Sequence, residues 1–221
     1  MSNLRKGLLL DFGGVISVTL FERHALSEAA LGLKPGTLTW RGPFDPEGDA
    51  LYADMLADRI TEREYWARRA AEVGRLFGEG WDMLTLIRRT LGNAPNRHVR
   101  PEAVAVVEEA KAAGIRVGIL SNELELFYGR ETVDGLDILK RMDSIVDATH
   151  TGVLKPDPRA YALGCAALGV APEETVFVDD QRRNIEGAKR AGLDSVLFDV
   201  TKAADSYAEV RRRLGLVTAP S

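Results

Sequence analysis

The stretch Leu8-Leu9-Leu10-Asp11-Phe12-Gly13-Gly14-Val15 decides how the rest of the sequence is interpreted. Three consecutive leucines lead into one acid, and two glycines follow after Phe12. A short, unbroken apolar run is typical of a central strand that is buried on both faces. Asp11 then falls at the carboxyl end of this strand, where open α/β sheets place their ligands. A carboxylate there can be a nucleophile, a metal ligand or both, although the stretch alone also fits a strand that ends in a turn.

The composition is that of an ordinary globular protein. The chain has 221 residues, 45% of them hydrophobic and 28% charged, and its formal net charge is −4. This charge offers no general attraction to nucleic acid or to an anionic membrane. No apolar run is long enough to span a bilayer, and the apolar stretch near the N-terminus is too short for a signal peptide. We therefore predict a cytoplasmic enzyme or binding protein with no nucleic-acid partner and no membrane partner, and the oligomeric state stays open.

The chain changes character after the first strand. Residues 17–96 lack strand-like runs and are rich in helix formers. Thr61-Glu62-Arg63-Glu64 has the form of a capping box, which predicts the start of a helix. Further helices are expected at residues 21–31, 49–56 and 81–91, and a loop is expected at residues 32–48. This region is interpreted as a small, all-helical insertion.

Helices and strands are expected to alternate in the rest of the chain. Strands are predicted at residues 115–120, 144–148, 175–178 and 195–198, and helices at 101–113, 157–168, 184–191 and 204–214, with 124–142 at least partly helical. Alternating units of this kind imply a parallel sheet with helices on both faces. The predicted fold class is α/β, a Rossmann-like core of residues 1–16 and 97–221 with residues 17–96 inserted as a helical cap. The tail at residues 217–221 is expected to be frayed.

Several polar side chains stand at the ends of the predicted strands. Ser121 and Asn122 follow one strand, and Asp179 and Asp180 follow another. Because the carboxyl ends of parallel strands meet at one edge of the sheet, these groups are expected to converge with Asp11. Three carboxylates in one pocket repel each other unless a cation joins them, and oxygen ligands beside phosphate favour Mg²⁺. The sequence therefore predicts a magnesium-assisted site for phosphate chemistry.

Each of these groups also has a simpler explanation when it is taken alone. The pair at residues 179–180 suits a helix N-cap, and the pair at residues 121–122 suits a turn. Lys155, in a loop at residues 152–158, would then be an ordinary solvated lysine. Their common position at one predicted edge favours a joint role, in which a hydroxyl, an amide and an ammonium complete an anion pocket.

Four short motifs follow one another along the chain. They are Asp-Phe-Gly-Gly-Val-Ile at 11–16, Leu-Ser-Asn at 120–122, Lys-Pro-Asp-Pro at 155–158 and Val-Asp-Asp-x-x-x-Asn at 178–184. Their order and spacing resemble the haloacid-dehalogenase-like (HAD) hydrolase superfamily over essentially the whole chain. The most similar branch has a helical cap after the first strand and includes glucose-1-phosphatase-like enzymes and the N-terminal phosphatase domain of soluble epoxide hydrolase. The resemblance implies a Mg²⁺-dependent phosphatase that acts on a small phosphorylated molecule through an aspartyl-phosphate intermediate.

The resemblance also implies roles for individual residues. Asp11 would be the nucleophile, and Lys155 would bridge Asp11 and the phosphate. Asp180 would bind Mg²⁺ directly and Asp179 directly or through water, while Asn184 would order the loop that carries these acids. The implied ligands are Asp11, Gly13, Asp179 and Asp180 for the metal, and Ser121, Asn122 and Gly13 for the phosphate.

The sequence departs from the family pattern at Gly13. Phosphatases of this family usually carry a second Asp at this position, which protonates the leaving group and then activates water. The backbone carbonyl of Gly13 can still bind a metal, but the acid–base role has no side chain, a loss that typically costs on the order of 10²–10⁴ in rate. Three explanations stay open: a leaving group that needs little protonation, a substitute from the cap such as Glu22 or His24, or loss of turnover with phosphate binding retained.

Two other functions stay open. Dehalogenases of the superfamily also lack the second Asp, because the halide that they release needs no proton. They use no metal, however, and they typically lack the acidic pair found here at residues 179–180; Arg41 or Arg88 would then act on a carboxylate substrate. The other alternative is a non-catalytic or regulatory protein that binds phosphate compounds. The cap residues that could line a substrate pocket are Trp40, Arg41, Tyr52, Trp66, Trp81 and Arg88.

Overall fold

The computed structural model describes residues 5–91 and 94–216, so the tail at 217–221 lies outside the described residues. The chain divides into two compact units. Of the described residues, unit 1 contains 5–18, 96–125 and 130–216, and unit 2 contains 19–91, 94–95 and 126–129. This division runs close to the predicted one, with residues 126–129 added to the helical unit; the assignment of the two units as core and cap stays a prediction. No helix in the described ranges is long and apolar enough to cross a membrane.

Unit 1 is built on a parallel sheet. In the described part of the chain the sheet has five strands in the spatial order β3-β2-β1-β4-β5. The strand that contains the leucine run is fully buried at the centre, between β2 and β4. The arrangement confirms the predicted α/β class. The strands are β1 (Gly7–Leu10), β2 (Arg116–Ser121), β3 (Ser144–Asp147), β4 (Thr175–Asp179) and β5 (Asp194–Leu197).

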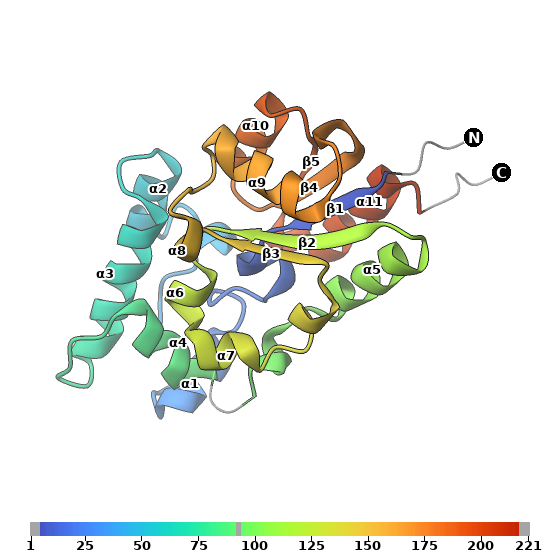
Figure 1. The fold of residues 1–221 in the computed structure, drawn as a ribbon. Coiled ribbons are helices and arrows are strands. Elements are labelled where there is room, and N and C mark those ends of the chain that lie inside the picture. The colour runs from blue at the N-terminus through green and yellow to red at the C-terminus, as the bar shows by residue number, and fades with distance from the viewer. Residues whose placement is uncertain (1–4, 92–93, 217–221) are drawn as a thin grey trace. The chain divides into compact units, whose positions relative to one another are not determined.

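Helices cover both faces of this sheet (Figure 1). On one face α9 and α10 pack over Leu9 and Phe177, with the Tyr161 ring edge-on to Phe177 at 5.4 Å between centroids. On the other face α5 and α11 pack against each other and the sheet. The apolar strands therefore bury both faces, as the unbroken leucine run predicted. The covering helices are α5 (Pro101–Ala112), α9 (Pro158–Leu168), α10 (Arg182–Arg190) and α11 (Ala203–Leu214). The shorter helices are α6 (Leu124–Tyr128), most of which belongs to unit 2, α7 (Arg130–Asp134) and α8 (Ala148–Thr151).

The register of the sheet fixes what stands at its carboxyl edge. Leu10 pairs with Ile119 of β2 and with Val178 of β4. Asp11 therefore comes level with Asp179, and the Asp11 amide donates to the Val178 carbonyl at 2.9 Å. The strand order reverses at β1, and this switch point is where open α/β sheets bind their ligands.

Unit 2 is helical in its described residues, with α1 (His24–Leu31), α2 (Ala50–Leu56), α3 (Glu62–Arg75) and α4 (Met83–Leu91). The capping box predicted for α3 is present, because Thr61 Oγ1 accepts from the Glu64 amide and the Glu64 carboxylate accepts from the Thr61 amide. The helix predicted from residue 21 begins only at His24. The reason is a local turn in which the Glu22 carboxylate accepts from the amide and hydroxyl of Thr19.

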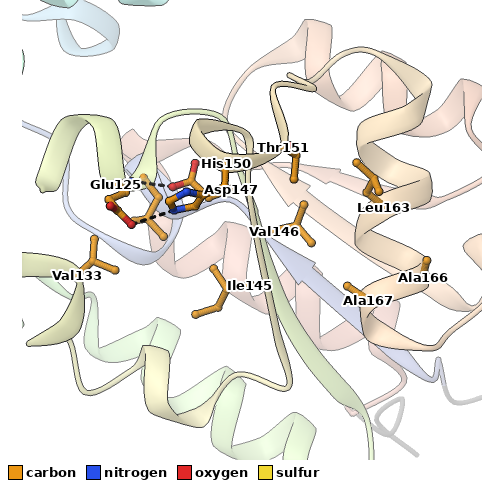
Figure 2. Close-up of a pocket in the computed structure, with 11 residues that line it drawn as sticks. Glu125, Val133, Ile145, Val146, Asp147, His150, Thr151, Leu163, Ala166 and Ala167 are labelled. Atoms are coloured by element: carbon orange, nitrogen blue, oxygen red, sulfur yellow. Dashed lines mark hydrogen bonds and ion pairs between the residues drawn. The ribbon is translucent and has the colours of Figure 1, made fainter. Parts of the chain in front are cut away.

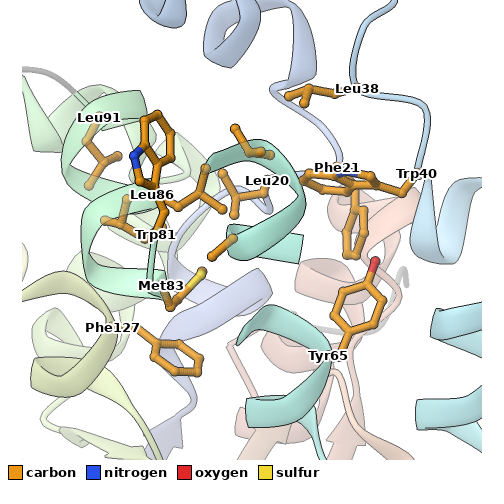
Figure 3. Close-up of a cluster of buried hydrophobic side chains, with 13 residues drawn as sticks. Leu20, Phe21, Leu38, Trp40, Tyr65, Trp81, Met83, Leu86, Leu91 and Phe127 are labelled. Carbon is orange, nitrogen blue, oxygen red and sulfur yellow. The ribbon is translucent and has the colours of Figure 1, made fainter. Parts of the chain in front are cut away.

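An aromatic cluster forms the core of unit 2 (Figure 3). The Phe21 ring lies 5.6 Å from Trp40 and 6.1 Å from Tyr65, measured between centroids. Asp49 is buried beside the cluster, where its carboxylate accepts from the Tyr65 hydroxyl at 2.9 Å and pairs with Arg69. This buried ion pair joins the start of α2 to α3.

His24 lies inside this cluster. Its ring packs edge-on against Trp40 at 4.3 Å, and neither ring nitrogen has a hydrogen-bond partner within the described residues. Burial, with a contribution from the positive charge of Arg41, lowers the pKa of His24 to about 4. The unfolded chain takes up this proton near pH 6.5. The folded protein should therefore lose stability as the pH falls from about 6.5 toward 4.

We expect His24→Phe to reduce this acid sensitivity, because phenylalanine fills the same aromatic position without a titrating group. Urea unfolding of the wild type and the variant at about pH 7 and about pH 5 measures the effect. The drop in the free energy of unfolding between the two pH values should be smaller in the variant. Equal drops in the two proteins would contradict a neutral, buried His24.

Candidate functional site

The carboxyl edge of the sheet brings together the three acids that the sequence placed there. Asp11 follows β1, Asp179 ends β4 and Asp180 follows it. One carboxylate oxygen from each lies within 4.8 Å of the others. Asp179 is fully buried, Asp11 is nearly so and Asp180 is half-buried. Oxygen donors at this spacing fit a hard divalent cation such as Mg²⁺, whose charge would offset their mutual repulsion.

Lys155 connects two of these acids. Its ammonium lies 2.9 Å from Asp11 Oδ1 and 2.7 Å from Asp179 Oδ2, and the side chain is 1% exposed. Burial alone would lower the pKa of Lys155, but the carboxylates of Asp11 and Asp179 raise it above the ordinary value for lysine. The ammonium therefore stays charged, and its burial excludes the alternative of an ordinary solvated lysine.

Asn122 holds the backbone of Lys155 in place. The Lys155 amide donates to Asn122 Oδ1 at 2.7 Å, and Asn122 Nδ2 donates to the Lys155 carbonyl at 3.1 Å. Both ends of the Asn122 side chain are engaged, which leaves the backbone as the part of this residue that suits the predicted phosphate contact. Ser121 is buried at the end of β2, at the same carboxyl edge as Asp11.

The carboxylate of Asp179 is surrounded by donors. Oδ1 accepts from the Gln181 amide at 2.8 Å and from Asn184 Nδ2 at 3.0 Å, and Oδ2 accepts from Lys155 Nζ. The Asn184 carbonyl in turn accepts from the Tyr161 hydroxyl at 2.6 Å. Because its oxygens are already engaged, Asp179 suits a metal contact through water better than a direct one. Asn184 thus fixes the orientation of the Asp179 carboxylate, and the role that the resemblance implies for it in ordering the loop stays a prediction.

The turn after Asp11 is held by residues that sequence reasoning did not find. Arg100 is buried, and its Nε donates to the Gly14 carbonyl at 3.0 Å. The buried Tyr207 hydroxyl donates to the Val15 carbonyl at 2.7 Å. Gly14 has a φ of 73°, and a Cβ at this position would lie 2.6 Å from Asp180 Oδ2. A glycine is therefore required at position 14, where the turn passes the acid cluster.

Unit 2 places the predicted cap residues in different settings. Trp40 and Trp81 are buried in its core, Tyr52 and Trp66 are half-buried against that core, and Arg41 and Arg88 are exposed. The two suggested acid–base substitutes are engaged within the unit, since Glu22 caps a turn and His24 is enclosed by aromatic rings. A role for any of these residues toward substrate stays a prediction.

A groove of about 350 Å³ follows the outer edge of β3 (Figure 2). Its lining includes Ile145 from the strand and Leu163 from α9, and His150 Nε2 lies 2.9 Å from Glu125 Oε2 beside it. None of the residues predicted for the site lines this groove. It is therefore separate from the acid cluster.

Comparison with known proteins places the chain in a family. Residues 6–192 match the model of the haloacid dehalogenase-like hydrolases. The chain belongs to this family. A validoxylamine A 7′-phosphate phosphatase from Streptomyces hygroscopicus subsp. limoneus is 33% identical to it over 161 residues, which are 72% of this chain and 75% of the relative. This membership confirms the resemblance found in the four motifs.

Relatives with a different named activity are similar as well. An (S)-2-haloacid dehalogenase 4A from Burkholderia cepacia is 36% identical over 97 residues, which are 43% of this chain and 41% of the relative. The chain spans less than half the length of several curated relatives that it matches, this dehalogenase among them. A solved dehalogenase structure, 21% identical, covers 100% of both chains with a TM-score of 0.62, which shows the shared fold.

We expect Lys155→Met to destabilise the protein by about 3–5 kcal/mol when no metal is added, because it leaves the buried carboxylates of Asp11 and Asp179 without their counter-charge. Urea unfolding in EDTA measures the loss, and the same experiment with Mg²⁺ should recover part of it. Lys140→Met, which removes an exposed lysine paired with Asp137, is the matched control and should change little. Equal stability of Lys155→Met and the wild type in EDTA would contradict the buried ion pairs.

Proposed function

We propose that this protein is a Mg²⁺-dependent phosphatase that removes phosphate from a small phosphorylated molecule through an aspartyl-phosphate on Asp11. The observation that carries the proposal is the position of Asp11 at the switch point of the sheet. There it forms an ion pair with a buried lysine and shares an acid cluster with residues 179–180. A nucleophile, a fixed cation and a set of oxygen ligands for a metal are the parts that phosphoryl transfer requires.

Each residue of the site has a separate role in the proposed reaction. An Asp11 carboxylate oxygen attacks phosphorus, and the Lys155 ammonium pairs with Asp11 and faces the charge of the phosphoryl oxygens. Ser121 and the backbone of Asn122 are assigned to bind those oxygens. Asp11, Asp180, the Gly13 carbonyl and, through water, Asp179 would hold Mg²⁺. When bound, this ion supplies charge stabilisation to the transferring group.

The acid cluster favours this activity over dehalogenation. A metal-independent dehalogenase needs one nucleophilic carboxylate, and two further acids within 4.8 Å would only add repulsion to its site. The same acids have a clear use when a divalent cation is bound between them. The similarity to a protein named as a phosphatase over 72% of this chain is consistent with the proposal, although a named dehalogenase is also similar over a shorter region.

A non-catalytic phosphate-binding protein is the second alternative. The number of buried residues that position Asp11 argues against this alternative. Lys155, Arg100 and Tyr207 all contact Asp11 or the turn that follows it, and all three are buried. Binding of phosphate alone would need the cation and the hydroxyl, but it would not need an acid held beside them. The cytoplasmic location and the lack of a nucleic-acid partner stay predictions from composition.

We expect the wild type to release phosphate from members of a panel of phosphorylated metabolites and an aryl phosphate, with Mg²⁺ and not with EDTA. Asp11→Asn should lose this release, because an amide oxygen does not attack phosphorus in place of a carboxylate. Asp137→Asn is the matched control, since it makes the same change at an exposed residue that pairs with Lys140. A phosphate-release assay on the three proteins makes the comparison.

Two results would overturn the proposal. Halide release from a 2-haloacid in EDTA, with no phosphate release from the panel, would establish the dehalogenase. Binding of inorganic phosphate with Mg²⁺, with no turnover of any panel member, would establish the non-catalytic protein.

A further inference from the structure

The two glycines after Asp11 are there for different physical reasons. Gly14 needs its left-handed backbone and has no room for a side chain. Gly13 has φ −65° and ψ 130°, a conformation that any residue adopts, and no atom of unit 1 lies within 4 Å of the position that its Cβ would take. Neither backbone strain nor packing within unit 1 therefore requires a glycine at position 13. The missing side chain leaves open space two residues after Asp11.

The polar groups around Asp11 are committed to other contacts. The Lys155 ammonium donates to Asp11 and Asp179, and the Asp179 oxygens accept from three neighbouring donors. Asp180 belongs to the acid cluster that would hold the metal, and the Ser121 hydroxyl is far too weak an acid to protonate a leaving group. In the described residues of unit 1, this cluster thus contains no side chain placed to give a proton to a departing oxygen.

We infer that Gly13 restricts the site to phosphates whose leaving group departs as a stable anion, namely acyl and aryl phosphates, and excludes alkyl phosphate esters. The inference rests on the proposed phosphatase function and narrows its substrate class. An alkyl leaving group departs as a strongly basic alkoxide and needs a proton in the transition state. A carboxylate or a phenolate of low basicity does not, so a site without an acid can release it.

The chemistry is consistent in both half-reactions. In the first, an Asp11 oxygen bonds to phosphorus, the bond from phosphorus to the leaving oxygen breaks, and the electron pair stays on that oxygen. In the second, water bonds to phosphorus, the bond to the Asp11 oxygen breaks, and the proton of the water passes to phosphate or solvent. The leaving group of the second step is the Asp11 carboxylate, itself a stable anion. A site that cleaves an acyl phosphate on its own aspartate is suited to cleave one on a substrate.

The open space at Gly13 makes a gain-of-function experiment possible. Gly13→Asp would place a carboxyl beside the nucleophile without a clash inside unit 1. Gly13→Asn has the same shape but no acidic proton, which makes it the matched control. The measurement is log(kcat/KM) against the pKa of the leaving group, for a series of aryl phosphates of graded acidity and one alkyl phosphate, with Mg²⁺ present.

The wild type should show a steep dependence on leaving-group pKa, with turnover of the alkyl phosphate only just above the background rate. Gly13→Asp should flatten this dependence and raise alkyl phosphate turnover by about 10²–10⁴-fold, the usual contribution of a positioned acid. Gly13→Asn should show no such gain. Circular dichroism and a Mg²⁺-dependent shift in melting temperature would show that both variants are folded and bind the metal.

Three results would overturn the inference. The first is a flat dependence in the wild type with alkyl turnover, which would mean that another group protonates the leaving oxygen. Glu123, a buried carboxyl that follows Asn122, would then be tested as Glu123→Gln. The second is a folded, metal-binding Gly13→Asp with no gain, and the third is an equal gain in Gly13→Asn. Failure of the phosphatase proposal itself looks different, because no substrate of the series, aryl phosphates included, would then show release that depends on Asp11.

Discussion

The ammonium of Lys155 between the carboxylates of Asp11 and Asp179 is the interaction on which the rest of the site depends. Three charges at the carboxyl edge of the sheet are removed from water, and this is tolerated only because each has an opposite charge within 3 Å. The pairing joins three segments that are far apart in the sequence, the ends of β1 and β4 and the loop at residues 152–158. Asn122 and Asn184 extend it, one fixing the backbone of the lysine and the other the carboxylate of Asp179.

The turn after Asp11 depends on a second constraint, which acts through the backbone. Arg100, just before α5, and Tyr207, in α11, each donate to a carbonyl of this turn although both are distant from it in the sequence. Leaving either buried carbonyl without a hydrogen bond would destabilise the folded protein by about 1–3 kcal/mol. The two donors therefore stabilise the backbone conformation that brings Gly14 close to Asp180. The position of Asp11 is therefore determined by strand β1 before it and by the hydrogen-bonded turn after it.

The sequence was sufficient for the fold and for the acids, because both leave local patterns. Apolar runs, helix caps and polar residues at strand ends predicted the sheet and placed Asp11, Asp179 and Asp180 at one edge of it. Arg100 and Tyr207 could not be found in this way, since a long-range hydrogen bond to a backbone carbonyl leaves no mark on the sequence around either partner. The same holds for residues 126–129, which join unit 2 because Phe127 belongs to the hydrophobic core of that unit.

The fold fixes where a nucleophile stands, and the groups beside it decide which bond it can break. Relatives named as phosphatases and as dehalogenases share this framework, so the framework alone does not separate the two. A second and a third acid beside a buried lysine are unfavourable unless a divalent cation is bound, which supports the proposed metal-assisted phosphate chemistry. In the proposed reaction, Gly13 would act on the other partner, the leaving group. A phosphatase that stabilises the phosphoryl group but offers no proton would select its substrates by the basicity of the leaving group, in addition to any recognition of the substrate's shape.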